Sequence, residues 1–130
     1  MGLKFFMARK ILVVDDEPDQ LQLVGEILME EGFATDRAIN GVDALKKIAH
    51  SLPDLVVVDA AMPYMNGFTL CENLRKNPAT ANIPIIMLTG LCSSFARLNG
   101  LAHGANIYMT KPFMSDDLVA KINELLTAKE

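Results

Sequence analysis

Five polar side chains that can bind cations or anions stand at the ends of short apolar runs. They are Asp15, Asp16, Asp59, Thr89 and Lys111. Adjacent carboxylates repel one another, so Asp15 beside Asp16 calls for a positive partner. Mg²⁺ is such a partner, because it takes a few carboxylate ligands, keeps several waters and bridges to phosphate oxygens. A carboxylate beside Mg²⁺ can also act as the nucleophile of covalent phosphoryl transfer, with lysine and threonine binding the transferred oxygens.

Each of these residues alone has an ordinary structural explanation. An aspartate after a strand is often a helix cap or a turn residue, and Thr89 alone is a common hydroxyl at a strand end. Lys111 precedes a proline, as many loop lysines do. Their joint occurrence at the ends of four separate apolar runs is what favours a shared site.

The apolar runs alternate with amphipathic segments along the chain. The pattern predicts strands over residues 10–15, 33–38, 54–59, 83–89 and 105–110, and helices over 18–31, 40–50, 68–76, 94–103 and 114–126. Strands alternating with helices predict a parallel sheet that is covered by helices on both faces. Ligands of such sheets bind beyond the carboxyl ends of the strands, where the five polar side chains are expected to meet.

Composition narrows the class of protein. The chain has 130 residues and a formal net charge of −4, which fits one acidic domain without a nucleic-acid-binding surface. No run is long and apolar enough to be a membrane span or a signal peptide, and Cys71 and Cys92 form neither a zinc nor a disulfide pattern. We therefore expect a cytoplasmic domain over 8–128, with 1–7 as an N-terminal extension or an expression remnant.

Four segments in this order carry a family resemblance: VVDDE, VVVDAAMPYMNG, MLTG and YMTKPF. Together they resemble the signature of the response-regulator receiver domain, the phosphoacceptor module of two-component signalling. The resemblance covers nearly the whole chain and implies a flavodoxin-like (βα)5 fold, a doubly wound parallel five-stranded sheet in the order 2-1-3-4-5. It also implies a signalling switch that catalyses only its own phosphorylation and dephosphorylation, rather than a metabolic enzyme.

The resemblance further implies roles for individual residues. Asp59 would accept a phosphoryl group from a histidine kinase or a histidine phosphotransfer protein. It would also bind Mg²⁺, or Mn²⁺ in its place. Asp16 would be a direct metal ligand, Asp15 a ligand mainly through water, and the backbone carbonyl of Ala61 a further ligand. Thr89 would hydrogen-bond the phosphoryl group.

The same resemblance implies how the signal leaves the site. Lys111 would pair with the acceptor before transfer and with a phosphoryl oxygen afterwards, and the Lys111–Pro112 bond is expected to be cis. Thr89 would shift on activation and leave space for Tyr108, the aromatic switch residue. The change would reach the surface of the fourth helix, fifth strand and fifth helix. A downstream protein would bind there, or a phosphorylation-dependent homodimer would form.

The chain departs from the family pattern at Ala61 and in the segment after Thr89, which includes Leu91. In the receiver family, the side chains two residues past the acceptor and two past the threonine flank the approach of hydrolytic water. The resemblance gives these places to Ala61 and Leu91. Neither can hydrogen-bond that water, so we expect slow self-dephosphorylation. The segment after Thr89 is also more apolar than in many receivers, so the choice of partner is left open.

Three other functions fit the residues of the chain less well. A phosphoaspartate hydrolase of the haloacid-dehalogenase type needs an acid where this chain has Ala61. A flavin carrier needs a loop rich in Ser, Thr and Gly after the first strand, where DDEPD would repel the flavin phosphate. A degenerate receiver is disfavoured by the complete acidic, lysine and threonine set. A stand-alone regulator, a phosphorelay intermediate and the receiver of a longer protein all remain open.

Overall fold

The computed structural model describes residues 8–128, so the predicted extension over 1–7 lies outside the described residues. The strands are β1 (Lys10–Val14), β2 (Ala34–Ala38), β3 (Leu55–Val58), β4 (Ile85–Thr89) and β5 (Ile107–Thr110). The helices are α2 (Pro18–Glu30), α3 (Gly41–His50), α4 (Gly67–Lys76), α5 (Ser94–Ala102) and α6 (Ser115–Ala128). All ten predicted elements are confirmed, with ends that differ from the prediction by at most two residues.

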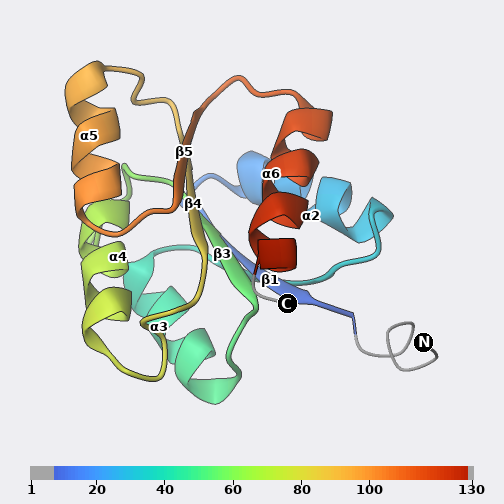
Figure 1. The fold of residues 1–130 in the computed structure, drawn as a ribbon, viewed down its shortest axis with the longest axis horizontal. Helices are drawn as coiled ribbons and strands as arrows, with labels where there is room; N and C mark the ends of the chain where they lie inside the picture. Colours follow the sequence, from blue (N-terminus) through green and yellow to red (C-terminus); the bar gives the residue numbers. More distant parts are fainter. Residues whose placement is uncertain (1–7, 129–130) are drawn as a thin grey trace.

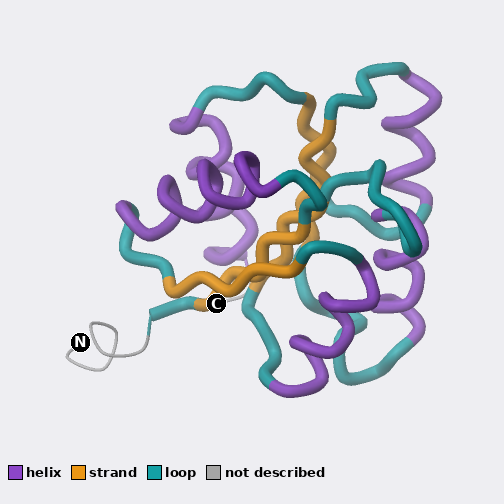
Figure 2. Tube along the Cα trace, turned by 180° about the vertical axis from the view of Figure 1, so that it is seen from behind, coloured by secondary structure: helices purple, strands orange, loops and turns teal. Residues whose placement is uncertain are grey.

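The strands form one parallel sheet in the order β2-β1-β3-β4-β5. Helices α3, α4 and α5 cover one face, and α2 and α6 cover the other (Figure 1). The connections between strands and helices are loops at the two ends of the strands (Figure 2). The predicted doubly wound flavodoxin-like architecture is therefore confirmed.

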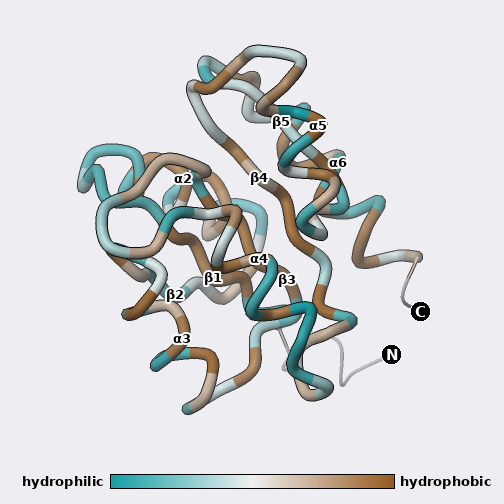
Figure 3. The backbone as a smooth tube through the Cα atoms, turned by 90° about the vertical axis from the view of Figure 1, so that its left-hand side faces the viewer, coloured by the Kyte–Doolittle hydropathy of each residue, from teal (hydrophilic) through white to brown (hydrophobic). Residues whose placement is uncertain are grey.

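Successive residues of a strand point to opposite faces of the sheet, so strands made of uninterrupted apolar residues make both faces apolar. The side beneath α3, α4 and α5 forms one core cluster, which includes Val14, Val58, Leu70, Leu74 and Met87. The side beneath α2 and α6 forms a second cluster, which includes Val13, Leu28, Val57, Leu118 and Ile122. The central strands accordingly form a hydrophobic band through the molecule (Figure 3). Burial of each large side chain stabilises the fold by about 1.5–3 kcal/mol. The ends of the strands therefore project from a well-packed core.

Several helix ends follow from local sequence. The side-chain oxygens of Asn40, Asn66 and Ser93 accept hydrogen bonds from backbone N–H groups in the first turns of α3, α4 and α5. Gly32 and Gly104 follow α2 and α5 with φ angles of 90° and 113°, which glycine adopts without strain.

The last helix begins at Ser115. It buries Leu118, Ile122 and Leu126 against the sheet, whereas Leu125 is only partly buried. Within residues 8–128, no helix combines the length and the apolar character needed to cross a membrane.

Candidate functional site

Three predicted site residues are each the first residue after a strand and remain hydrogen-bonded to the neighbouring strand. The backbone N–H of Asp15 donates to Ala38 O, and that of Asp59 donates to Val14 O. The N–H of Lys111 donates to Thr89 O at 2.8 Å. These bonds fix the side chains at the carboxyl edge of the sheet, so the parallel register itself brings them together.

The side chains of these three residues meet at that edge. Lys111 Nζ lies 2.7 Å from Asp15 Oδ2 and 3.2 Å from Asp59 Oδ2. Both carboxylate side chains are 7% exposed, and the lysine side chain is 15% exposed. One ammonium is thus shared by two carboxylates in a largely desolvated position.

Backbone turns orient the two carboxylates. Asp15 Oδ1 accepts a hydrogen bond from the N–H of Glu17 at 3.0 Å, and Asp59 Oδ1 accepts one from the N–H of Ala61 at 3.1 Å. Each carboxylate therefore has one oxygen tied to its own loop and the other directed at Lys111. This arrangement is preorganised, because neither carboxylate depends on a flexible partner for its orientation.

An acidic cluster with room for a metal ion lies at the same place. One carboxylate oxygen from each of Asp15, Glu17 and Asp59 lies within 4.8 Å of the others. Asp16 is exposed, and it lines a neighbouring hollow of about 510 Å³ together with Ala61. The structure thus brings Asp15 and Asp59 together and places Asp16 beside them. Sequence reasoning missed Glu17, although its signal lay in the same VVDDE segment.

The electrostatics of the cluster favour an additional cation. Burial raises the pKa of Asp15 above its ordinary value of 3.8, and the contact with Lys111 offsets this only in part. Burial lowers the pKa of Lys111, but the hydrogen bonds and charges of Asp15 and Asp59 outweigh it, so the net pKa lies above 10.5. Oxygen ligands in a site short of positive charge suit a hard divalent cation.

A second chain of contacts joins Thr89 to Tyr108. Thr89 is fully buried, and its Oγ1 accepts a hydrogen bond from the N–H of Leu91 at 3.3 Å. The hydroxyl of Tyr108 donates to the carbonyl oxygen of the same Leu91 at 2.6 Å. The ring of Tyr108 is buried beneath α5, with 3% of the residue exposed. The two predicted switch residues are therefore connected through the backbone of Leu91.

The chain matches the response regulator receiver domain family over residues 11–123. It belongs to that family. This receiver is 39% identical over 120 residues to the phosphate regulon transcriptional regulatory protein PhoB of Rhizobium meliloti, covering 92% of this chain and 53% of that protein. It is 35% identical over 117 residues to the DNA-binding dual master transcriptional regulator RpaA of a Synechocystis species, covering 90% of this chain and 48% of that protein. The receiver thus spans about half the length of these two relatives.

Solved structures agree with this assignment. A putative response regulator from Chloroflexus aurantiacus has a TM-score of 0.90 at 34% identity, over 93% of this chain and 99% of that one. A CheY-like receiver domain protein from Methanospirillum hungatei has a TM-score of 0.87 at 32% identity, over 94% of this chain and 96% of that one. This receiver is accordingly a signalling module of two-component systems, in which receivers interact with histidine kinases and effector domains.

The structure also shows the bond before Pro112 and the surroundings of the two cysteines and of His103. The Lys111–Pro112 bond is cis, as expected. Cys71 is buried in the core, and burial raises the pKa of its thiol to about 12, so it is an inert packing residue. Cys92 is exposed in the loop after β4. His103 caps the C-terminal end of α5, and its Nδ1 lies 2.7 Å from Asn99 O.

Proposed function

We propose that Asp59 accepts a phosphoryl group from a phosphohistidine on a histidine kinase or a histidine phosphotransfer protein. The observation that carries this proposal is the sharing of Lys111 by two oriented, buried carboxylates. Asp59 is the better acceptor because it follows β3, which pairs with β1 and with β4. Asp59 therefore lies between Asp15, at the end of β1, and Thr89, at the end of β4.

The metal site of the proposal consists of Asp15, Asp16 and Asp59 with the carbonyl oxygen of Ala61, and Glu17 lies close enough to contribute. Mg²⁺ is the proposed ion and Mn²⁺ its substitute, because both accept carboxylate and carbonyl oxygens. When bound, the ion offsets the charge of the carboxylates and of the phosphoryl oxygens. The excess of acidic over basic groups at this edge supports the assignment.

The reaction needs little beyond positioning and charge compensation. A carboxylate oxygen of Asp59 attacks phosphorus, the phosphorus–nitrogen bond to the donor imidazole breaks, and the imidazole leaves with the bonding electron pair. Lys111 can then move from the acceptor carboxylate to a phosphoryl oxygen, and the hydroxyl of Thr89 can donate to another. Self-dephosphorylation is the attack of water on the same phosphorus, which regenerates the Asp59 carboxylate.

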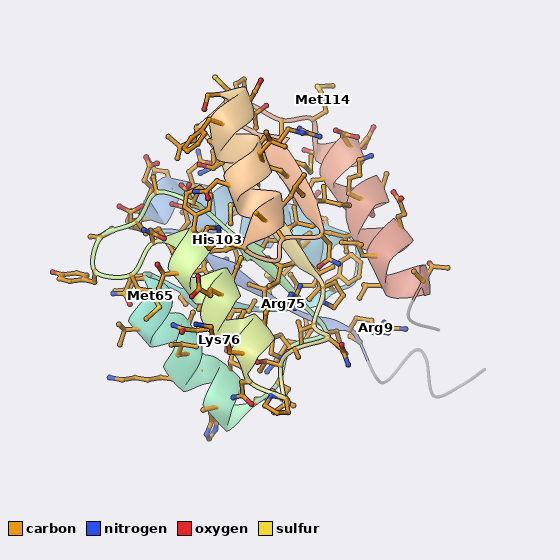
Figure 4. All side chains as sticks on the ribbon, turned by 60° about the vertical axis from the view of Figure 1, so that its left-hand side comes forward. Arg9, Met65, Arg75, Lys76, His103 and Met114 are labelled. Atoms are coloured by element: carbon orange, nitrogen blue, oxygen red, sulfur yellow. The ribbon has the colours of Figure 1, made fainter. Side chains whose placement is uncertain are left out.

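The proposed output surface consists of α5, β5 and α6. Four large apolar side chains are exposed there: Phe95, Leu98, Leu101 and Met114, with the first at 80% and the last at 74%. A hollow of about 590 Å³ lies between α5 and α6, and Met114 is one of its lining residues. Met114 lies in the segment that joins β5 to α6 (Figure 4). Exposed apolar groups in one region mark a protein-binding surface. We propose that a downstream protein or a second, phosphorylated copy binds here.

We also propose that the domain extends over 8–128 and that its location is cytoplasmic. Both cysteines of the described structure are unpaired, which fits a reducing compartment.

The function is tested by incubating the protein with acetyl phosphate and Mg²⁺ and measuring its intact mass. One phosphoryl group should be added per chain, and chelation of Mg²⁺ should prevent the addition. Asp59→Asn should abolish it, whereas Asp54→Asn serves as a matched control, because Asp54 precedes β3 and binds the backbone of Lys10 at the opposite edge. Full labelling of the Asp59→Asn protein would refute the proposal.

A further inference from the structure

Gly100 lies inside α5, directly over the ring of Tyr108. A Cβ atom added to Gly100 would lie 2.7 Å from Cδ2 and 3.0 Å from Cε2 of Tyr108, and 3.1 Å from Sδ of Met87. Tyr108 and Met87 are both buried, at 3% and 0% exposed, so an added Cβ would press on packed core side chains. The position therefore admits no side chain while the ring stays where it is.

The backbone does not require glycine at this position. Among the described residues, the glycines with positive φ are Gly32 and Gly104, and Gly100 is not one of them. An alanine could adopt the helical conformation of α5 and would favour the helix over glycine. The contact with the Tyr108 ring is thus the physical reason for an unfavourable helix residue here.

The Tyr108 ring connects this contact to the phosphoryl site. Its hydroxyl donates to Leu91 O at 2.6 Å, and Leu91 N–H donates to Thr89 Oγ1 at 3.3 Å. With one lone pair of the Thr89 hydroxyl engaged by Leu91, its hydrogen is left to be donated elsewhere. An inward Tyr108 ring therefore holds the loop after β4 and orients the hydroxyl that is proposed to bind the phosphoryl group.

We propose that Gly100 is a positioning residue of the switch. The missing side chain of Gly100 forms the socket for the inward Tyr108 ring, and through Leu91 this socket orients Thr89. The link to phosphoryl binding rests on the proposed function of the site, whereas the socket itself does not.

The socket is tested by a double-mutant cycle measured by thermal unfolding. Gly100→Ala should lower Tm in the wild-type background, because its Cβ displaces the ring. In a Tyr108→Val background the same substitution should raise Tm. The ring is then absent, the flexible Met87 side chain can shift into the vacated space, and the helix preference for alanine decides the sign. Equal losses of Tm in both backgrounds would overturn the proposal.

Gly25 offers a matched control in α2. A Cβ at Gly25 would lie 2.7 Å from Nη2 of Arg37, as close as the contact at Gly100. That neighbour is the tip of a flexible side chain, which can move aside. Gly25→Ala should therefore leave Tm unchanged or raise it. A loss of Tm as large as that of Gly100→Ala would mean that any added Cβ is harmful, and would overturn the proposal.

The link to the site is tested with beryllofluoride and Mg²⁺ as the probe. Gly100→Ala should shift the amide resonances of Thr89 and Leu91 and weaken beryllofluoride binding on the order of fivefold, because the oriented arrangement becomes a minority. In a Tyr108→Phe background, which lacks the hydroxyl, Gly100→Ala should still lower Tm but should not weaken binding further. Unchanged amide resonances in Gly100→Ala would overturn the link.

Failure of the proposed function gives a different result. If beryllofluoride does not bind the wild-type protein at all, the phosphoryl assignment is wrong. The thermal cycle and the amide resonances of Thr89 and Leu91 still decide whether Gly100 positions Tyr108 in the way proposed.

Discussion

Replacement of Lys111 by methionine should destabilise the protein strongly in the absence of Mg²⁺. Methionine keeps a long side chain of comparable volume but removes the only ammonium that contacts Asp15 or Asp59 within the described structure. Two carboxylates that are 7% exposed then face each other without a cationic partner and keep only one backbone hydrogen bond each. Removing one member of a buried ion pair is costly because the remaining charge has lost its solvation without compensation.

The magnitude follows from the geometry. Oxygens of the two carboxylates lie within 4.8 Å of each other. At an effective dielectric constant of roughly 20, unit charges at this separation repel by about 3 kcal/mol. Protonation of Asp15, whose pKa burial already raises, relieves part of this repulsion. We therefore expect Lys111→Met to lower the free energy of unfolding by about 2–3 kcal/mol at pH 7.

The assay is urea unfolding at pH 7 with EDTA and again with excess Mg²⁺. The cation should restore a substantial part of the loss, because it binds the folded carboxylate cluster. Lys76→Met is the matched control: Lys76 on α4 pairs with Glu72 at 2.9 Å, but its side chain is 71% exposed (Figure 4). Its loss should stay below about 0.5 kcal/mol. Equal effects of the two substitutions in EDTA would show that the buried contacts of Lys111 stabilise the fold no more than an exposed ion pair does.

Three further predictions concern the same edge of the sheet. The contribution of Lys111 to the free energy of unfolding should be complete below pH 10.5 and lost as pH rises through its raised folded pKa. Urea unfolding at a series of alkaline pH values would show this loss. A pH dependence identical to that of Lys111→Met would contradict this prediction. Asp16→Asn should weaken Mg²⁺ binding in calorimetric titrations and leave the metal-free stability equal or higher. Glu17→Gln should also weaken Mg²⁺ binding if Glu17 shares the ion. Wild-type Mg²⁺ affinity in Asp16→Asn would refute the role of Asp16 as a ligand. Ala61→Asn combined with Leu91→Glu should speed phosphoryl loss on the order of tenfold, or about 1.4 kcal/mol of barrier, and decay no faster than wild type would disprove slow hydrolysis by an unoriented water.

The fold could be predicted because its signals are local and repeated. Apolar β-branched runs such as that ending at Val58 indicate strands buried on both faces, and cap residues such as Asn66 mark helix starts. The parallel direction of the strands then follows from the alternation of strands and helices. The ends of the elements were less certain, as at Ser115, because a side chain that can cap a helix can equally begin one.

The site could be predicted only as far as strand ends define it. The meeting of Asp15, Asp59 and Lys111 follows from sheet topology, and the structure confirms that contact. The place of Glu17 depends on the turn after β1, and that of Gly100 depends on which way a ring on another element points. Turn conformation and ring direction of this kind leave no periodic signal in the sequence.

Asp59, and no other carboxylate of the cluster, is proposed to carry the phosphoryl group. The most direct measurement is reductive trapping of the acyl phosphate after incubation with acetyl phosphate and Mg²⁺, followed by peptide mass spectrometry to locate the reduced residue. The reduced residue should be Asp59 alone, and it should be absent when Mg²⁺ is chelated. A reduced residue at Asp15 or Asp16, or none in a wild-type protein incubated with Mg²⁺, would contradict it.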